Sequence, residues 1–193
     1  MEQEKIKKVN VPYLLGSIFL PIVAIVLVTA ISVIFLPSNV GSIISMVVLV
    51  AAIIWWSIGI KKVHDKKKEE KLKELDSQGF IRNHTFNSDN CTVAVDVEHG
   101  KIAITFKWNP SQIYVMPANK ITKMWVDDGK TPLGGTSRVS FLFIVDGIKI
   151  RVNTFISNKA WSMKSSQVLE ALSKADMMVE TLKASAQTAC NIQ

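Results

Sequence analysis

Residues 11–60 read VPYLLGSIFLPIVAIVLVTAISVIFLPSNVGSIISMVVLVAAIIWWSIGI and contain no charged residue. They divide into two apolar runs, 11–36 and 40–60, which are separated by the polar break Pro37-Ser38-Asn39. A helix needs roughly 20 apolar residues to cross the hydrocarbon core of a bilayer. Lipid also requires each backbone N–H and C=O to be paired within its own segment, so helices are favoured although both runs are rich in β-branched residues. The sequence therefore predicts a two-helix transmembrane hairpin.

Two other interpretations of these runs fit less well. A buried core hairpin of a soluble protein rarely contains two adjacent spans without one charge. A cleaved signal peptide has an apolar part of roughly 7–15 residues, which is shorter than the run 11–36, and no clear small-x-small cleavage site follows that run.

The distribution of lysine predicts the orientation of the hairpin. The connection between the two runs has no Lys or Arg, whereas lysines flank both outer ends. These lysines are Lys5, Lys7 and Lys8 before the first run, and Lys61, Lys62, Lys66, Lys67, Lys68, Lys71 and Lys73 after the second. By the positive-inside rule, both termini are expected in the cytoplasm. We expect a multi-pass protein of the bacterial inner (cytoplasmic) membrane.

Aromatic residues and lysines mark the expected membrane interface. Trp55 and Trp56 lie just before Lys61 and Lys62, and Tyr13 lies near the start of the first run. Tryptophan and tyrosine are enriched at the level of the lipid head groups. These five residues are the predicted membrane-interface residues.

Residues 61–76, KKVHDKKKEEKLKELD, predict a charged helix that continues the second span. Its apolar residues are only Val63, Leu72 and Leu75, which favours a solvated stalk. A second interpretation is a clamp on anionic lipid head groups through Lys61–Lys73, since each basic residue near the surface contributes about 1 kcal/mol. The net charge of the chain is +7, and this stretch and the N-terminal ten residues contribute +3 of it. It does not indicate a nucleic-acid partner.

The hydrophobic period changes from helical to two after Gly79. Alternating apolar residues of this kind predict antiparallel strands. Asp146-Gly147 predicts a two-residue hairpin turn, because both positions need positive φ, and His99-Gly100 is expected to form a turn of the same kind. The clearest strands are expected at 91–97, 101–106, 139–145 and 148–152, and shorter ones at 80–86, 111–116 and 120–127.

A last helix is predicted over residues 159–185, with Asn158 as its N-cap. Its apolar stripe predicts packing across an open sheet or barrel, and self-association as a coiled coil is the alternative. The tail after Ala186 is expected to fray. The stripe consists of Trp161, Ser165, Val168, Leu172, Ala175, Val179 and Leu182.

Seven antiparallel strands followed by one amphipathic helix is the order of a pleckstrin-homology-like (PH-like) fold. The segments TVAVDVEHGKIAITF (92–106) and YVMPANKITKMWVDDG (114–129) resemble the strand pattern of bacterial PH-like domains, including those of small membrane proteins. The resemblance covers about residues 80–185. It implies a non-enzymatic platform for lipid heads, peptides or self-assembly. Members of this family that bind phosphoinositides carry a dense basic cluster in the turn after the first strand of the pattern. In this chain the corresponding residues, 98–101, contain one lysine, so specific phosphoinositide binding is not expected.

The sequence offers no catalytic, cofactor or metal site. His64, His84 and His99 are dispersed, and Cys91 and Cys190 lack the spacing of zinc ligands. Two cysteines on the cytoplasmic side are expected to be reduced thiols. We therefore expect no cofactor, no metal and no enzymatic activity.

The segment 128–136 is the longest predicted loop of the strand region, and loops carry function more often than strands. Lys130 and Arg138 make it a candidate partner-binding loop for an anion or an acidic partner.

Together these features predict an α+β membrane protein with four parts. These are a cytoplasmic N-terminus (1–10), a transmembrane hairpin (11–60), a charged juxtamembrane helix (61–78) and a cytoplasmic PH-like β-barrel or sandwich capped by an amphipathic helix (79–193). The expected function is a non-enzymatic, membrane-anchored interaction module that binds a protein partner or itself. The alternative is a membrane-active effector or exclusion factor that acts through oligomerisation of the hairpin.

Overall fold

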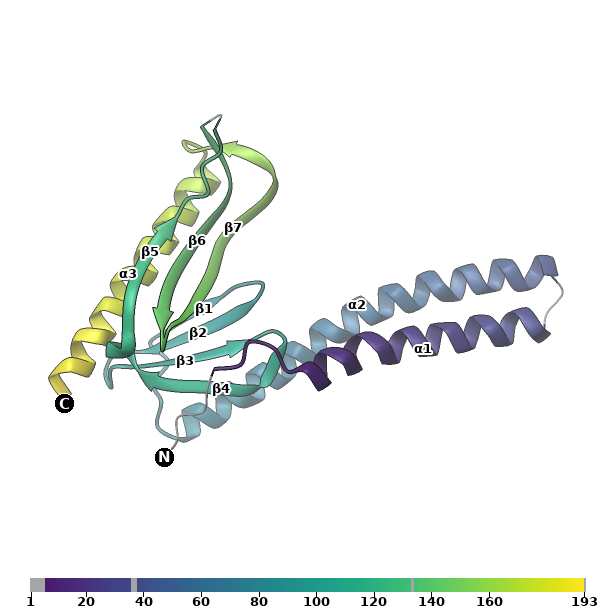
Figure 1. Cartoon of the computed structure of the whole chain (residues 1–193), viewed down its shortest axis with the longest axis horizontal. Coiled ribbons are helices and arrows are strands. Elements are labelled where there is room, and N and C mark those ends of the chain that lie inside the picture. The colour runs from purple at the N-terminus through teal and green to yellow at the C-terminus, as the bar shows by residue number, and fades with distance from the viewer. Residues whose placement is uncertain (1–5, 36–37, 133, 193) are drawn as a thin grey trace.

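The computed structural model describes residues 6–35, 38–132 and 134–192 (Figure 1). Within these residues it is an α+β protein, in which two helices precede seven antiparallel strands and a C-terminal helix. The helices are α1 (Val11–Phe35), α2 (Ser38–Ser77) and α3 (Ser166–Ile192). The strands are β1 (His84–Asn87), β2 (Cys91–Asp96), β3 (Lys101–Phe106), β4 (Asn109–Pro117), β5 (Ile121–Asp127), β6 (Gly135–Val145) and β7 (Ile148–Ser162), with the short 3₁₀ helix η1 (Ala118–Lys120) before β5.

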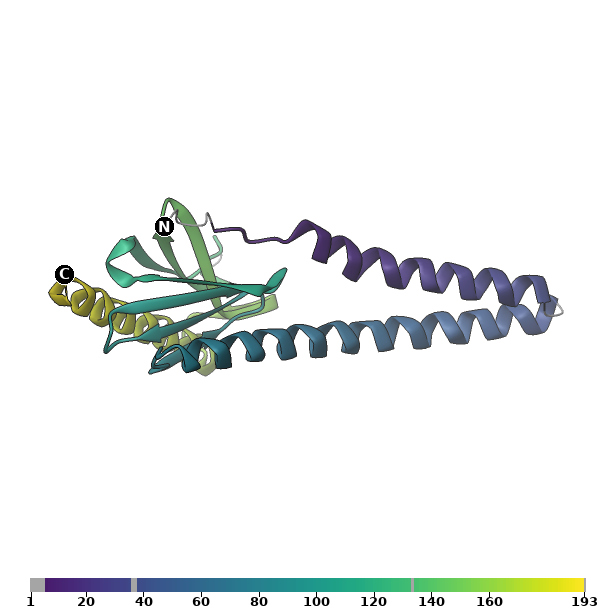
Figure 2. The same ribbon diagram turned by 90° about the horizontal axis from the view of Figure 1, so that it is seen from below.

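Helices α1 and α2 run antiparallel as a long hairpin that projects away from the strands (Figures 1 and 2). On α1, the stretch Val11–Ile31 is unburied, has a mean hydropathy of 2.7, and is long and apolar enough to cross a membrane. The predicted second span, 40–60, forms the first half of α2, but many of its side chains lie outside the described residues. That span therefore stays a prediction. Ser38 already belongs to α2, and Pro37 of the predicted break lies outside the described residues.

The charged segment 61–76 continues the second predicted span as one helix, as expected, because α2 runs without interruption to Ser77. The prediction of a solvated stalk is wrong for its last two turns. Leu72 and Leu75 are only 3% and 5% exposed. Two leucines three residues apart lie on one helical face, and this narrow stripe is enough to dock the end of α2 on the sheet.

Small side chains on the sheet explain how α2 can approach it. Ala94 of β2 and Ala103 of β3 are opposite each other in the ladder, and both are buried with Leu72, Leu75 and Phe80 in one apolar cluster. An alanine pair leaves room for a helix to lie close to the strands. The outer face of this sheet is thus covered by the same helix that forms half of the hairpin.

The strands form two antiparallel sheets, ordered β1-β2-β3-β4 and β5-β6-β7. The main core lies between their inner faces and α3, and it is built from alternate strand residues, as the period of two predicts. The members contributed by β6 and β7 are Val139, Phe141, Phe143, Val145, Ile150 and Val152, and α3 adds Val168, Ala171, Ala175, Met178 and Leu182.

Of the two predicted hairpin turns, one is confirmed and one is wrong in detail. Asp146 and Gly147 have φ values of 49° and 74° and join β6 directly to β7. Between β2 and β3, by contrast, only Gly100 has positive φ, at 62°, and the connection comprises residues 97–100. His99 is instead held by Asp96, as described below.

The last helix begins later and ends later than predicted. Ile156, Trp161 and Ser162 pair with β6 across a register shift, so β7 extends to Ser162 and Asn158 is not a helix cap. Trp161 lies on this strand and not on the helical stripe. The tail does not fray at Ala186, because α3 continues to Ile192 and Ala189 is buried against the β2–β3 connection.

Candidate functional site

The two basic residues of the predicted partner-binding loop each face a carboxylate. The Lys130 ammonium lies 2.8 Å from Asp128, and the Arg138 guanidinium lies 3.8 Å from Asp127. Asp127 is also 3.4 Å from Arg151. The charges of this loop are therefore largely compensated within the chain, and its role in binding stays a prediction.

The predicted membrane-interface residues lie at the base of the helical hairpin. The indole N–H of Trp56 donates to the Ser17 carbonyl at 2.9 Å and so ties α2 to α1. Lys61 and Lys62 are exposed. The side chain of Trp55 lies outside the described residues.

The segment just before α1 is bound to the first sheet, so the hairpin meets the strands at a second place besides the end of α2. The Asn10 N–H donates to the Trp108 carbonyl at 2.8 Å, and the Lys7 N–H donates to the Tyr114 hydroxyl at 2.8 Å. The Asn109 side chain in turn donates to the Lys7 carbonyl at 3.0 Å. Residues 7–13, α2 and the β3–β4 turn meet in one region, and we call this region the junction.

A buried histidine lies at the centre of the junction. His64 of α2 is 6% exposed, and its Nδ1 forms a hydrogen bond of 3.1 Å with the Tyr13 hydroxyl of α1. The Trp108 ring packs edge-on against the imidazole, with the ring centroids 5.5 Å apart. The other ring nitrogen, Nε2, is buried and has no hydrogen-bond partner among the described residues.

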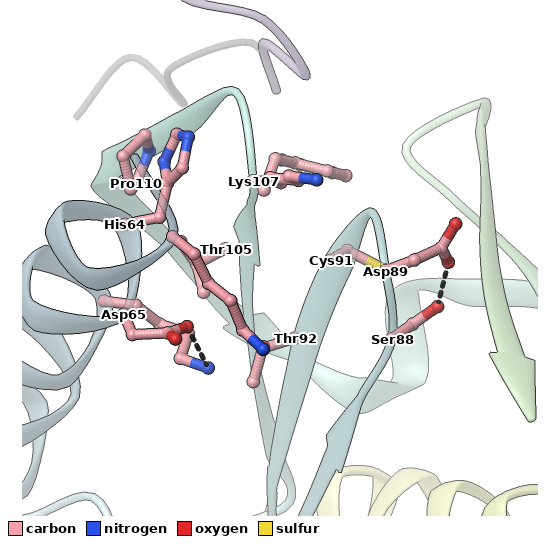
Figure 3. Close-up of a pocket in the computed structure, with 12 residues that line it drawn as sticks. His64, Asp65, Ser88, Asp89, Cys91, Thr92, Thr105, Lys107 and Pro110 are labelled. Atoms are coloured by element: carbon pink, nitrogen blue, oxygen red, sulfur yellow. Dashed lines mark hydrogen bonds and ion pairs between the residues drawn. The ribbon is translucent and has the colours of Figure 1, made fainter. Parts of the chain in front are cut away.

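Beside His64 lies a cavity of about 380 Å³, which we call the junction cavity (Figure 3). It lies between the base of α2, the β1–β2 connection and the end of β3. Thr105 lines it, and its hydroxyl oxygen is a second buried atom without a partner among the described residues. Its lining also includes Lys61, His64, Asp65, Lys68, Ser88, Asp89, Cys91, Thr92, Phe106, Lys107 and Pro110.

The charges around the junction cavity are unevenly compensated. Lys68 lies 3.7 Å from Asp65, so this pair is nearly neutral. Burial tends to raise the pKa of Asp89, but hydrogen bonds from Ser88 and Asn153 outweigh burial, and the pKa is lowered. Lys61 and Lys107 have no carboxylate within 4.0 Å among the residues that the structure describes, although Lys107 is near enough to Asp89 to contribute to the lowering of its pKa.

Burial and a raised pKa disfavour the thiol in the cavity wall as a nucleophile. Burial, with a smaller contribution from Asp89, raises the pKa of Cys91 to about 12, and the thiol donates to the Arg151 carbonyl at 3.4 Å. Thiolates, not thiols, react with electrophiles. Cys91 is therefore a packing residue of the cavity.

Alkylation should distinguish the two cysteines. We expect iodoacetamide at pH 8 to modify the exposed Cys190 and to leave the buried Cys91 unmodified in the folded protein. Peptide mass spectrometry would measure both sites, and the unfolded protein, in which both should react, is the control. Rapid modification of Cys91 in the native protein would contradict its burial.

A buried carboxylate on the other side of the domain has a structural role. Asp96 is fully buried and accepts hydrogen bonds from the Ile81 N–H, the His99 N–H and the His99 ring, each at 2.8–2.9 Å. The Ser185 hydroxyl of α3 donates to the Asp96 carbonyl at 3.1 Å. Asp96 thus joins the α2–β1 linker, the β2–β3 connection and α3.

The sequence did not reveal the junction cavity, because its parts are far apart in the chain. In the sequence His64 stands out only as one of three dispersed histidines, and Trp108 carries no local signal of a site. No local pattern relates these residues to Tyr13. Within the described residues, no group of His, Cys, Asp and Glu side chains could hold a metal ion.

Searches of protein-family models, of curated proteins and of solved structures find no match to this chain.

Proposed function

We propose that this protein is a non-enzymatic, membrane-anchored interaction module that binds an anionic group in the junction cavity. The observation that carries the proposal is the cavity itself. It lies where the helical hairpin meets the first sheet, and its lining combines Lys61 and Lys107, which form no ion pair within 4.0 Å among the described residues, with two residues, His64 and Thr105, that each have a buried polar atom without a partner there. Buried polar atoms are almost always hydrogen-bonded, so such atoms in a cavity wall favour a polar occupant.

The anchoring part of the proposal rests on the hairpin. The unburied apolar stretch of α1 supports one crossing, and exposed apolar residues of α2, such as Ile43, Met46, Val47 and Ile54, support a second. Lysines flank both outer ends, which supports cytoplasmic termini at a bacterial inner membrane. The order of a four-stranded sheet, a three-stranded sheet and a C-terminal helix supports a PH-like domain. Fold alone does not establish a function, so the ligand must be inferred from the cavity.

The chemistry of the cavity favours a phosphate-like anion. Lys61 and Lys107 supply positive charge from two different elements, and the Thr105 hydroxyl and His64 Nε2 can donate hydrogen bonds. Hydrogen bonds between such donors and an anion are stronger than neutral ones. The phosphate of an anionic lipid head group and a soluble anion share this chemistry. A protein partner, self-association and a role of loop 128–136 stay predictions.

The proposal can be tested with the full-length protein in nanodiscs. We expect the double variant Lys61→Ala/Lys107→Ala to lose about tenfold or more in anion affinity, because each charge-assisted hydrogen bond contributes roughly 1.5–3 kcal/mol. One experiment measures retention of phosphatidylglycerol by native mass spectrometry, and the other titrates sulfate into discs of phosphatidylcholine alone. The first identifies a lipid head group as the source of the anion, and the second a soluble anion.

The matched control is Lys159→Ala/Lys164→Ala, which removes the same charge from exposed positions on β7 and just before α3. It should retain the affinity of the unaltered protein. Equal losses in the two double variants, or no anion bound in either experiment, would contradict the proposal.

A further inference from the structure

Among the described residues that line the junction cavity, His64 is the one whose side chain can change charge near neutral pH. Its imidazole is held on one edge by Tyr13 and packed against Trp108, so its position is fixed by two elements besides its own helix. The two ring nitrogens of an imidazole point in nearly opposite directions. Nδ1 is bonded to Tyr13, which does not line the cavity, and Nε2 is the ring nitrogen without a partner among the described residues. Nε2 is closed to solvent in this structure, so an occupant reaches it only after the imidazole or its neighbours shift.

In the junction as the structure describes it, positive charge on His64 is disfavoured. Burial lowers the pKa of His64 below its ordinary value of 6.5, and Lys107 lowers it further, whereas Asp65 opposes the shift. Lys67 also lowers it, and its ammonium lies 4.6 Å from the centroid of the Tyr13 ring. The charged and titratable groups around His64 and its cavity come from every element packed there. They are Tyr13 on α1, Lys61, Asp65, Lys67 and Lys68 on α2, Asp89 after β1, Cys91 on β2 and Lys107 after β3.

An anion in the cavity would reverse this preference. It offsets the repulsion from the lysines, and once a shift of the ring opens Nε2 to the cavity it can accept a hydrogen bond from Nε2–H. The imidazolium retains its contact with α1, because Nδ1–H can donate to the Tyr13 hydroxyl oxygen. Neither ring nitrogen of the charged form would then lack a partner.

We propose that His64 takes up a proton when an anion occupies the junction cavity, so that anion binding tightens as pH falls. The inference rests on the proposed function and adds its regulation. The direction follows from linkage, since the anion favours the charged form and raises the pKa of His64 in the complex. The gain in anion affinity is therefore fully present at pH values below the pKa that His64 has in the free protein. It is lost as pH rises through the higher pKa that His64 has in the complex.

The test uses NMR of full-length protein labelled at histidine Cε1, in nanodiscs of phosphatidylcholine, between pH 5.0 and 8.5. The chain has three histidines, and the variants His84→Gln and His99→Gln assign the other two signals. Sulfate is the probe, because it remains a dianion throughout this range. We expect saturating sulfate to raise the pKa of His64 by about one unit, which corresponds to about tenfold tighter sulfate binding at low pH than at high pH.

The outcomes separate the two proposals. If sulfate binds but the His64 titration does not move, proton uptake is wrong and the proposed function stands. If sulfate fails to bind at every pH and no anionic lipid is retained, both proposals are wrong. The variant His64→Gln should bind sulfate with a flat pH profile, and the wild-type titration decides the question if that variant does not fold.

Discussion

Replacing Gly100 with alanine is expected to displace the C-terminal end of α3 and to lower the free energy of unfolding by about 2–5 kcal/mol. Gly100 has a φ of 62°, and a Cβ built there would lie 2.4 Å from the Ala189 nitrogen and 2.6 Å from its Cα. These are backbone atoms of a helix and cannot rotate away. The substitution therefore combines the strain of a left-handed residue with a steric clash. Differential scanning fluorimetry of the full-length protein, with hydrogen exchange of α3, would measure the effect.

Gly147→Ala is the matched control, because it introduces the strain of a left-handed alanine without a steric clash. Gly147 also has positive φ, at 74°, but nothing lies within 4 Å of an added Cβ. It should lower the free energy of unfolding by only about 1–2 kcal/mol and leave the exchange of α3 unchanged. Equal effects of the two substitutions would show that the contact between Gly100 and α3 is not close in solution.

Removal of the Asp96 carboxylate is the second change with a large expected effect. Asp96→Ala leaves the Ile81 and His99 N–H groups without their acceptor at a buried position, and it releases the His99 ring. We expect the free energy of unfolding to fall by about 3 kcal/mol. Breaking a fully buried ion pair would cost more, but His99 is half-exposed. Thermal unfolding of the full-length protein would measure it. A loss below about 1 kcal/mol would contradict the bridging role of this residue.

The same carboxylate should make the free energy of unfolding depend on pH in the acidic range. Burial alone would raise the pKa of Asp96, but the hydrogen bonds from Ile81 and His99 outweigh burial and hold the pKa below its ordinary value of 3.8. The stabilisation is thus present above the pKa of the unfolded chain and is lost as pH falls through the lower pKa of the folded state. Asp96→Asn should therefore lose less stability than the unaltered protein between pH 5 and pH 2.5. Parallel curves for the two proteins would contradict this assignment.

Much of the strand region could be predicted because its signals are local. Strict alternation located β2, β3, β6 and β7, and the Asp146-Gly147 turn fixed the register of one hairpin. The start of α3 was not predictable in the same way. Trp161 and Ser165 fit a helical stripe, but Trp161 and Ser162 find partners in β6, and this pairing extends β7 into the predicted helix.

The docking of α2 and the junction cavity could not be predicted, since both depend on distant residues. Leu72 and Leu75 are too few to indicate a buried helix, and their burial depends on the alanine pair of another segment. His64 lies within a run of lysines that resembles any juxtamembrane segment. Only the three-dimensional structure places it between Tyr13 and Trp108.

The attachment of residues 6–10 to the first sheet has a consequence for the order in which the protein is made. Ile6 belongs to the main core and Lys7 binds Tyr114, yet more than 100 residues separate the latter pair. Synthesis proceeds from the N-terminus at about 5–20 residues per second, so this segment emerges several seconds before its partners exist. Both helices of the hairpin are made in that interval. The core can therefore be completed only after the hairpin has formed. If the proposed two-span insertion failed and only one helix crossed the membrane, Ile6 would lie on the opposite side from the strands it packs against.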